Sequence, residues 1–201
     1  MNKLADNIIS LYERHAQTWD AERRRGGWND KVCHNQFIQS LPRNASVLDL
    51  GCGGGSPVAE NLVAQGVQVT GVDSSPTLIK LCRSRLSDQE WIIGDIRTVV
   101  LGRTFNGILA WDSFFHLQPD DQRAMFEIFA AHAKPKTMLM FNTGPAYGEA
   151  IGTYRGDPLY HASLGGEEYR VLLQQHNFGV VQHSIEDAAA GGRTIWLAQA
   201  C

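Results

Sequence analysis

The chain has 201 residues, of which 43% are hydrophobic and 19% charged, and its formal net charge is −3. This length fits one globular domain with a sizeable core. The charge balance argues against nonspecific electrostatic binding of nucleic acid, which needs a clustered basic face. No window of the sequence offers the roughly 20 apolar residues of a membrane helix.

The N-terminus lacks an apolar run of signal-peptide length, and the four cysteines are scattered without a CxxC pair. Free thiols in a reducing compartment are the simplest interpretation. We therefore expect a cytoplasmic protein, a monomer or a homodimer, without nucleic-acid or membrane partners.

The first 44 residues predict two helices. Apolar residues recur at helical spacing between Leu4 and His15, which indicates an amphipathic helix. A second helix is expected over residues 30–40, ending before Pro42. The basic run at residues 23–25 is interpreted as a solvated helix face, with a substrate or phosphate contact as the alternative.

Strand-like and helix-like segments alternate from residue 45 to residue 142, as in α/β domains. Ser75 is a plausible N-cap, with Pro76 in the first turn of its helix. Strands are expected over residues 46–50, 67–72, 90–94, 105–111 and 137–142. Helices are expected over residues 56–65, 76–86 and 120–133.

The alternation stops after residue 142. Residues 143–166 are rich in Gly, Pro and Tyr and lack clear periodicity, so we expect a long functional loop. A helix over residues 167–176 follows. Two strands over residues 179–186 and 194–200, with no helix between them, predict a terminal antiparallel pair.

A glycine-rich turn joins the first strand of this region to the following helix, in the sequence Asp49-Leu-Gly51-Cys52-Gly53-Gly-Gly. Glycines allow a sharp turn and a close approach of the backbone to a ligand, and the helix N-terminus presents free N–H groups. Asp73 follows at the end of the next strand, where a carboxylate can accept both hydroxyls of a ribose. The alternative is a tight turn with Asp73 as a helix cap.

Two cofactor classes fit a ribose-binding β-α-β unit. Nicotinamide enzymes favour GxGxxG, but the last glycine position is Ser56 here and Asp49 precedes the turn. A carboxylate would repel a pyrophosphate, whereas it would attract the ammonium group of a methionine. This argument favours S-adenosylmethionine over NAD.

Three segments, Asp49 to Gly55, Gly71 to Asp73 and Gly94 to Ile96, resemble the first three motifs of the class I S-adenosylmethionine-dependent methyltransferases. The resemblance covers residues 45–142 best. It implies a Rossmann-like, doubly wound α/β fold with a seven-stranded, mostly parallel sheet, an antiparallel C-terminal strand and helices on both faces. It also implies binding roles along the cofactor. The turn holds the methionine end through Asp49, Gly51, Cys52 and Gly53; Asp73 and Ser74 face the ribose; Asp95 and Ile96 meet the adenine.

The segment after the fourth strand, residues 110–117, is similar to the family's fourth motif, which lines the methyl-transfer site. Trp111 is the cofactor-side candidate. His116, His161 and Asp112 are the candidate bases, because an acceptor that carries a proton must lose it. For His116 the alternative is a hydrogen-bonded histidine at a helix start.

The N-terminal segment, residues 12–20, resembles the cap helix of many small-molecule methyltransferases. Tyr12 and Trp19 are therefore candidates for closing over the cofactor, or else they pack the helix onto the sheet. No Cys/His cluster of ligand spacing is apparent, so no metal is expected.

We therefore predict a single methyltransferase domain over residues 1–201 that methylates a small molecule and releases S-adenosylhomocysteine. Its parts are cap helices (1–44), a cofactor-binding core (45–142), a substrate-side loop (143–166) and a C-terminal helix and strand pair (167–201). The alternatives are an NAD(P)-dependent Rossmann oxidoreductase and a non-catalytic S-adenosylmethionine-binding regulatory module.

Overall fold

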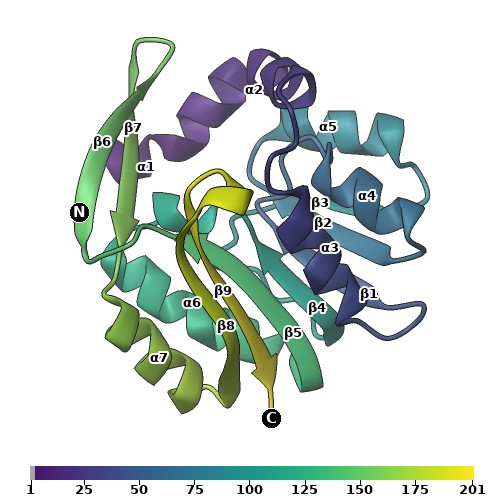
Figure 1. The fold of residues 1–201 in the computed structure, drawn as a ribbon. Helices are drawn as coiled ribbons and strands as arrows, with labels where there is room; N and C mark the ends of the chain where they lie inside the picture. The colour runs from purple at the N-terminus through teal and green to yellow at the C-terminus, as the bar shows by residue number, and fades with distance from the viewer. Residues whose placement is uncertain (1–2) are drawn as a thin grey trace.

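The computed structural model describes residues 3–201, and its centre is a seven-stranded sheet in the order β3-β2-β1-β4-β5-β9-β8 (Figure 1). The strands are β1 (Ser46–Leu50), β2 (Gln68–Asp73), β3 (Glu90–Ile93), β4 (Phe105–Ala110), β5 (Ala133–Thr143), β8 (Phe178–Asp187) and β9 (Arg193–Ala200).

Strand β9 alone runs antiparallel to both of its neighbours, β5 and β8. Strands β1 to β5 pair in parallel, with β1 between β2 and β4. The predicted seven-stranded, mostly parallel sheet is confirmed. In such sheets ligands bind beyond the carboxyl ends of the strands, where the order reverses, and here that point lies between β1 and β4.

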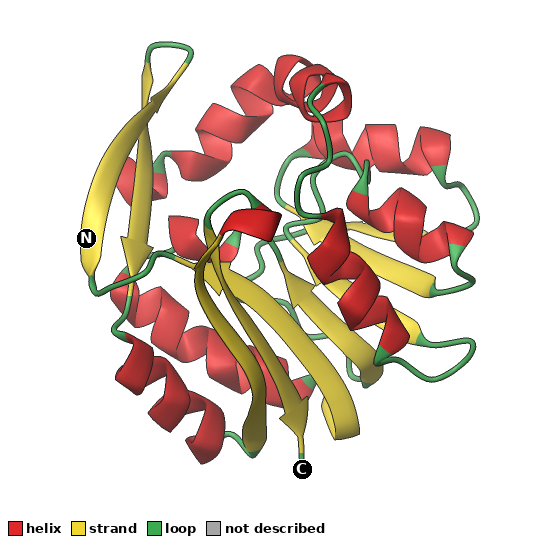
Figure 2. Ribbon diagram, in the orientation of Figure 1, coloured by secondary structure: helices red, strands yellow, loops and turns green. Residues whose placement is uncertain are grey.

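Helices cover both faces of the sheet (Figure 2). Helices α3 (Lys31–Gln39), α4 (Val58–Ala64) and α5 (Pro76–Arg85) pack on one face, and α6 (Pro119–Ala131) and α7 (Gly166–Gln175) pack on the other. Each face has its own core. One core is centred on Phe114, Phe126, Phe141 and Trp196, all at most 1% exposed.

Local sequence explains where these helices begin. Ser75 caps α5 by accepting a hydrogen bond from the Leu78 N–H at 3.1 Å, and Pro76 occupies the first turn, as the sequence predicts. Helix α6 begins at Pro119, and Asp120 and Asp121 lie in its first turn, where acids favour the helix dipole.

The expected unstructured loop over residues 143–166 is wrong. This segment forms a β-hairpin of β6 (Gly148–Tyr154) and β7 (Asp157–Ser163), separate from the main sheet. Arg155 and Gly156 form its two-residue turn with φ of 50° and 88°, the positive values that tight hairpin turns require. Arginine is an unusual residue at the first position of such a turn, so the sequence does not predict the hairpin.

The short helix α1 (Lys3–Asp6) lies beside the hairpin, and helix α2 (Ile8–Arg25) runs from there above the carboxyl ends of the strands toward α5 (Figure 1). Polar contacts join α2 to the hairpin. Asp157 accepts from Arg14 at 2.7 Å and from His15 Nε2 at 2.8 Å, and the Tyr154 hydroxyl donates to Glu22 at 2.7 Å. None of the described helices has the length and apolar character to cross a bilayer.

Candidate active site

The glycine-rich turn after β1 is closely packed on two sides. Gly51 and Gly53 have φ of +83° and +56°, which side chains disfavour. A Cβ on Gly51 would lie 2.3 Å from the Ser113 Cβ, and one on Gly53 would lie 2.9 Å from the Trp19 ring. The turn therefore needs glycine both for its conformation and for its contacts with α2 and the segment after β4.

Two buried carboxylates flank this turn. Asp49 is 3% exposed and Asp73 is 9% exposed. Asp73 accepts hydrogen bonds from the N–H groups of Gly53 and Ser75, both at 2.9 Å. Burial raises the pKa of Asp73, and burial together with the charge of Asp73 raises the pKa of Asp49 to about 7.

Neither carboxylate has an Arg, Lys or His within ion-pair distance among the described residues. Buried charges are normally paired. Two buried carboxylates without a cationic partner, beside a turn built mainly of glycine, fit a ligand that brings a positive charge and hydroxyl donors. These are the features of S-adenosylmethionine.

Asp95 lies after β3 at the other end of the crevice. Burial alone would raise its pKa, but the Arg97 guanidinium, 2.6 Å away, outweighs burial and lowers it. Arg97 donates to both Asp95 oxygens through its backbone N–H, Nε and Nη2, so an adenine amino group would share these oxygens with Arg97.

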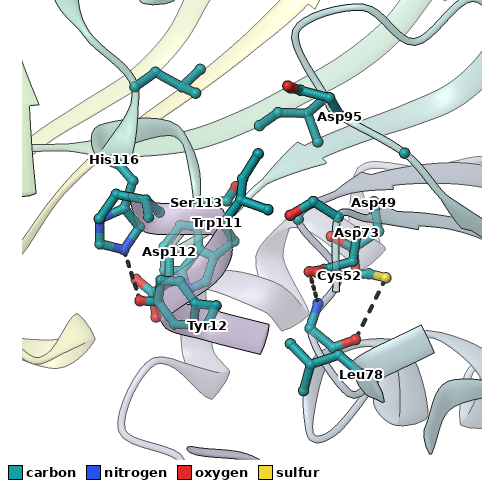
Figure 3. A pocket seen from close by; sticks show the side chains of 18 of the residues that line it. Tyr12, Asp49, Cys52, Asp73, Leu78, Asp95, Trp111, Asp112, Ser113 and His116 are labelled. Atoms are coloured by element: carbon teal, nitrogen blue, oxygen red, sulfur yellow. Dashed lines mark hydrogen bonds between the residues drawn. The ribbon is translucent and has the colours of Figure 1, made fainter. Parts of the chain in front are cut away.

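Tyr12 and His116 lie together on one side of the crevice, opposite Asp49 and Asp73 (Figure 3). The Tyr12 hydroxyl lies 2.8 Å from His116 Nε2, and His116 Nδ1 lies 2.8 Å from the Tyr160 carbonyl oxygen. Because a carbonyl only accepts, Nδ1 carries the proton, and Nε2 accepts from Tyr12. Burial lowers the pKa of His116 to about 4 and raises that of Tyr12.

Asp112 is held by its neighbours. Both of its oxygens accept from Arg193 at 2.8 Å, and Asn142 exchanges two hydrogen bonds of 2.8 Å with its side chain and backbone. These contacts also stabilise its left-handed backbone, with φ of 50°. They favour a positioning role for Asp112 over its predicted role as a base, which stays untested.

His161 lies on β7, outside the cofactor crevice. Its ring stacks on Phe115 at 5.2 Å and lies 4.9 Å from the His116 ring. Burial lowers its pKa. His161 therefore lies on the far side of His116 from the crevice.

Two cavities meet at this site. The first is the crevice along the strand ends, and it is lined by every predicted cofactor residue: Asp49, Gly51, Cys52, Gly53, Asp73, Ser74, Asp95, Ile96, Trp111, Tyr12 and Trp19. The second, of about 610 Å³, lies between β5, the hairpin and Gly192 and includes Phe115 and His161. Five residues line both: Tyr12, Trp19, Arg23, Asp112 and His116.

Sequence reasoning missed Asn142 and Arg193 and interpreted Arg23 as solvated. Arg24 and Arg25 are exposed, whereas Arg23 lies at the junction of the two cavities. No local motif marks Arg193, which reaches the site only because β9 pairs with β5. In residues 3–201 no three His, Cys, Asp or Glu side chains are grouped to hold a metal ion.

The family model described as a methyltransferase domain matches residues 20–183. The chain belongs to this methyltransferase family. The resemblance and the fold that it implies are therefore confirmed, and the nicotinamide oxidoreductase alternative is not supported.

Curated relatives of this methyltransferase are similar over part of their length. A ubiquinone biosynthesis O-methyltransferase of Coxiella burnetii is 37% identical over 102 residues, 48% of this chain and 42% of the relative. A dTDP-3-amino-3,6-dideoxy-alpha-D-glucopyranose N,N-dimethyltransferase of Streptomyces fradiae is 29% identical over 160 residues, 71% of this chain and 62% of the relative. The matches thus span less than two thirds of these relatives.

Solved structures share the fold of this methyltransferase at low identity. CalS10, an amino pentose methyltransferase from Micromonospora echinaspora, was solved with S-adenosylmethionine. It has a TM-score of 0.71 and 18% identity, with 92% of this chain and 96% of CalS10 covered. The 1,6-didemethyltoxoflavin-N1-methyltransferase of Burkholderia thailandensis, solved with S-adenosylhomocysteine, has a TM-score of 0.73 and 18% identity, covering 98% and 87%.

Proposed function

We propose that this chain transfers the methyl group of S-adenosylmethionine to a small-molecule acceptor and releases S-adenosylhomocysteine. The observation that supports this proposal best is the junction of two cavities, one suited to the cofactor and one to an acceptor. The second cavity, of about 610 Å³, falls within the range of small-molecule sites, about 300–1,000 Å³. The crevice is smaller, about 130 Å³, and its lining residues rather than its volume support its assignment to the cofactor.

In this proposal, different residues of the chain bind the methionine, ribose and adenine parts of the cofactor. Asp49 faces the methionine ammonium, and the turn residues Gly51, Cys52 and Gly53 lie along the methionine. Asp73 and Ser74 take the ribose, and Asp95 and Ile96 take the adenine. Tyr12, Trp19 and Trp111 close the crevice and exclude water.

Methyl transfer requires acceptor, methyl and sulfur in line, so alignment supplies most of the rate enhancement. When bound, S-adenosylmethionine supplies an electrophilic methyl group on a positively charged sulfur. His116 faces both cavities, and its unprotonated Nε2 accepts from the Tyr12 hydroxyl. The pair can therefore take the proton that a nitrogen or oxygen acceptor loses, with the Tyr12 oxygen accepting that proton as it passes its own to Nε2. His161 and Phe115 form an aromatic wall for the acceptor.

The site residues are compatible with either a nitrogen or an oxygen as the acceptor atom. The relatives include an O-methyltransferase and N,N-dimethyltransferases, and the same neutral imidazole serves either chemistry. A non-catalytic binding module remains the alternative, but it would not need a second cavity that opens onto the cofactor crevice. Cytoplasmic location, a monomer or homodimer, and the lack of nucleic-acid partners remain predictions from the sequence.

Isothermal titration calorimetry with S-adenosylmethionine, S-adenosylhomocysteine and NADH tests the proposal. We expect saturable binding of the first two ligands and none of NADH. A panel of small amines and phenols then identifies acceptors through release of S-adenosylhomocysteine. Binding of NADH in place of the two sulfur compounds would overturn the proposal.

A further inference from the structure

Two carboxylates and two guanidiniums form a cluster where the two cavities meet: Arg23, Asp30, Asp112 and Arg193. Arg193 binds Asp112 at 2.8 Å, and its Nη2 lies 3.7 Å from Asp30. Arg23 Nη2 lies 3.3 Å from Asp30 and 3.5 Å from Asp112. The two positive and two negative charges cancel, so the cluster is electrically neutral.

Asp30 is the buried member of this cluster and lines neither cavity. It occupies the N-cap position of α3, but its side chain makes no capping hydrogen bond. Instead its Oδ2 accepts from the Trp111 indole at 2.7 Å, and the side chain is fully buried. A buried carboxylate costs several kcal/mol unless it is paired, so helix capping does not explain its presence.

Among the carboxylates of this cluster, only that of Asp30 is fully shielded from solvent. Burial alone would raise its pKa, but its neighbours outweigh burial and lower it: His34 Nε2 at 3.9 Å, beyond hydrogen-bond reach, the Arg23 guanidinium at 3.3 Å and the Trp111 indole at 2.7 Å. His34 lies one helical turn later and is itself buried, and burial lowers its pKa. The carboxylate is thus ionised beside a neutral imidazole.

We propose that Asp30 is a positioning and charge-balancing residue for the methyl donor, an inference that rests on the proposed function. Its hydrogen bond orients Trp111, and its charge offsets Arg23, and both of these side chains line the cofactor crevice. Without Asp30 the cluster carries one net positive charge. That charge opposes a sulfonium and does not oppose the neutral thioether of the product.

The substitution Asp30→Asn removes the charge and keeps an acceptor oxygen for Trp111. We expect it to lower the affinity for S-adenosylmethionine about two- to thirtyfold more than that for S-adenosylhomocysteine, because one unit charge near the crevice is lost. Calorimetry with both ligands measures the two affinities. Glu168→Gln is the matched control, because it breaks the surface pair with Arg123 on the α6–α7 face.

A second variant tests the same inference independently if the Asp30→Asn protein does not fold. Arg23→Gln leaves the cluster with one net negative charge, so the affinity ratio should shift in favour of S-adenosylmethionine. Equal losses for both ligands in each variant would show a merely structural role and overturn the inference alone. Failure of the unmodified protein to bind either ligand would overturn the proposed function as well.

Discussion

Hydrogen bonding sets the tautomer of His116, and burial sets its protonation state. The Tyr160 carbonyl fixes the proton on Nδ1, and burial keeps the ring neutral with a pKa of about 4. In the unfolded chain the pKa is near 6.5. The imidazole therefore stays neutral over the whole physiological range, with Nε2 hydrogen-bonded to the Tyr12 hydroxyl.

The pKa of His116 predicts how stability depends on pH. As pH falls from about 6.5 to 4, the unfolded chain binds a proton that the folded protein refuses, so stability falls by at most about 3 kcal/mol. His116→Gln should flatten this part of the curve. Urea unfolding at pH 7 and pH 5 measures it, and an unchanged slope in the variant would contradict the assignment.

Asp73 provides a second prediction for a single side chain. Asp73→Ala should weaken binding of S-adenosylmethionine by about 1–3 kcal/mol, because the ribose hydroxyls lose their acceptor. The substitution also releases the N–H groups of Gly53 and Ser75, so thermal unfolding should be checked in parallel. Asp88→Asn, on an exposed turn, is the control, and equal affinities for all three proteins would remove Asp73 from its role.

At the scale of elements, α2 and the hairpin together cover both cavities. Their contacts at Asp157 are polar and partly exposed, with Arg14 57% and Asp157 30% exposed. Exposed ion pairs are worth about 0.2–1 kcal/mol each. These pairs therefore add a small contribution to the buried apolar contacts of Ile8 with the hairpin.

Asp157→Asn should loosen this cover without unfolding the domain. We expect faster amide hydrogen exchange in α2 and in the hairpin, while exchange in β1 and β4 is unchanged. The melting temperature should move little. Hydrogen-exchange mass spectrometry makes the comparison, with Glu168→Gln as a surface-pair control; identical exchange in the hairpin would show that other contacts hold it.

Sequence periodicity predicted the sheet core and the Ser75 cap because these depend on neighbouring residues and local pattern. The hairpin escaped detection because its turn rests on Arg155, whose positive φ has no sequence signature. The Arg193–Asp112 pair escaped because it joins residues 81 positions apart. The predicted cofactor residues share one crevice because each follows the end of a parallel strand or lies on the cap helix.

At the scale of the whole molecule, one aromatic cluster ties α6 and α7 to the centre of the sheet. Phe141 on β5 is fully buried and stacks on Trp196 of β9 with rings 7° from parallel. It also contacts Phe114, from the segment that carries His116, at 5.2 Å. The core is therefore in direct contact with the segment that carries His116.

Phe141→Ala should cost about 3–5 kcal/mol of unfolding free energy, a large part of the 5–15 kcal/mol typical of a domain. We expect a strongly lowered urea midpoint, with Phe141→Leu losing much less. Circular dichroism follows both transitions. A loss below about 1 kcal/mol for the alanine variant would mean that the cluster repacks around the cavity.

Arg193 opens β9, the strand that enters the sheet between β5 and β8. Its guanidinium anchors Asp112, so a nascent polypeptide still inside the ribosome at this point has every glycine of the cofactor turn in place but no completed transfer site. Truncated products that lack β9 should therefore leave Asp112 without its Arg193 partner, and the junction of the two cavities is complete only after this last strand has joined the sheet.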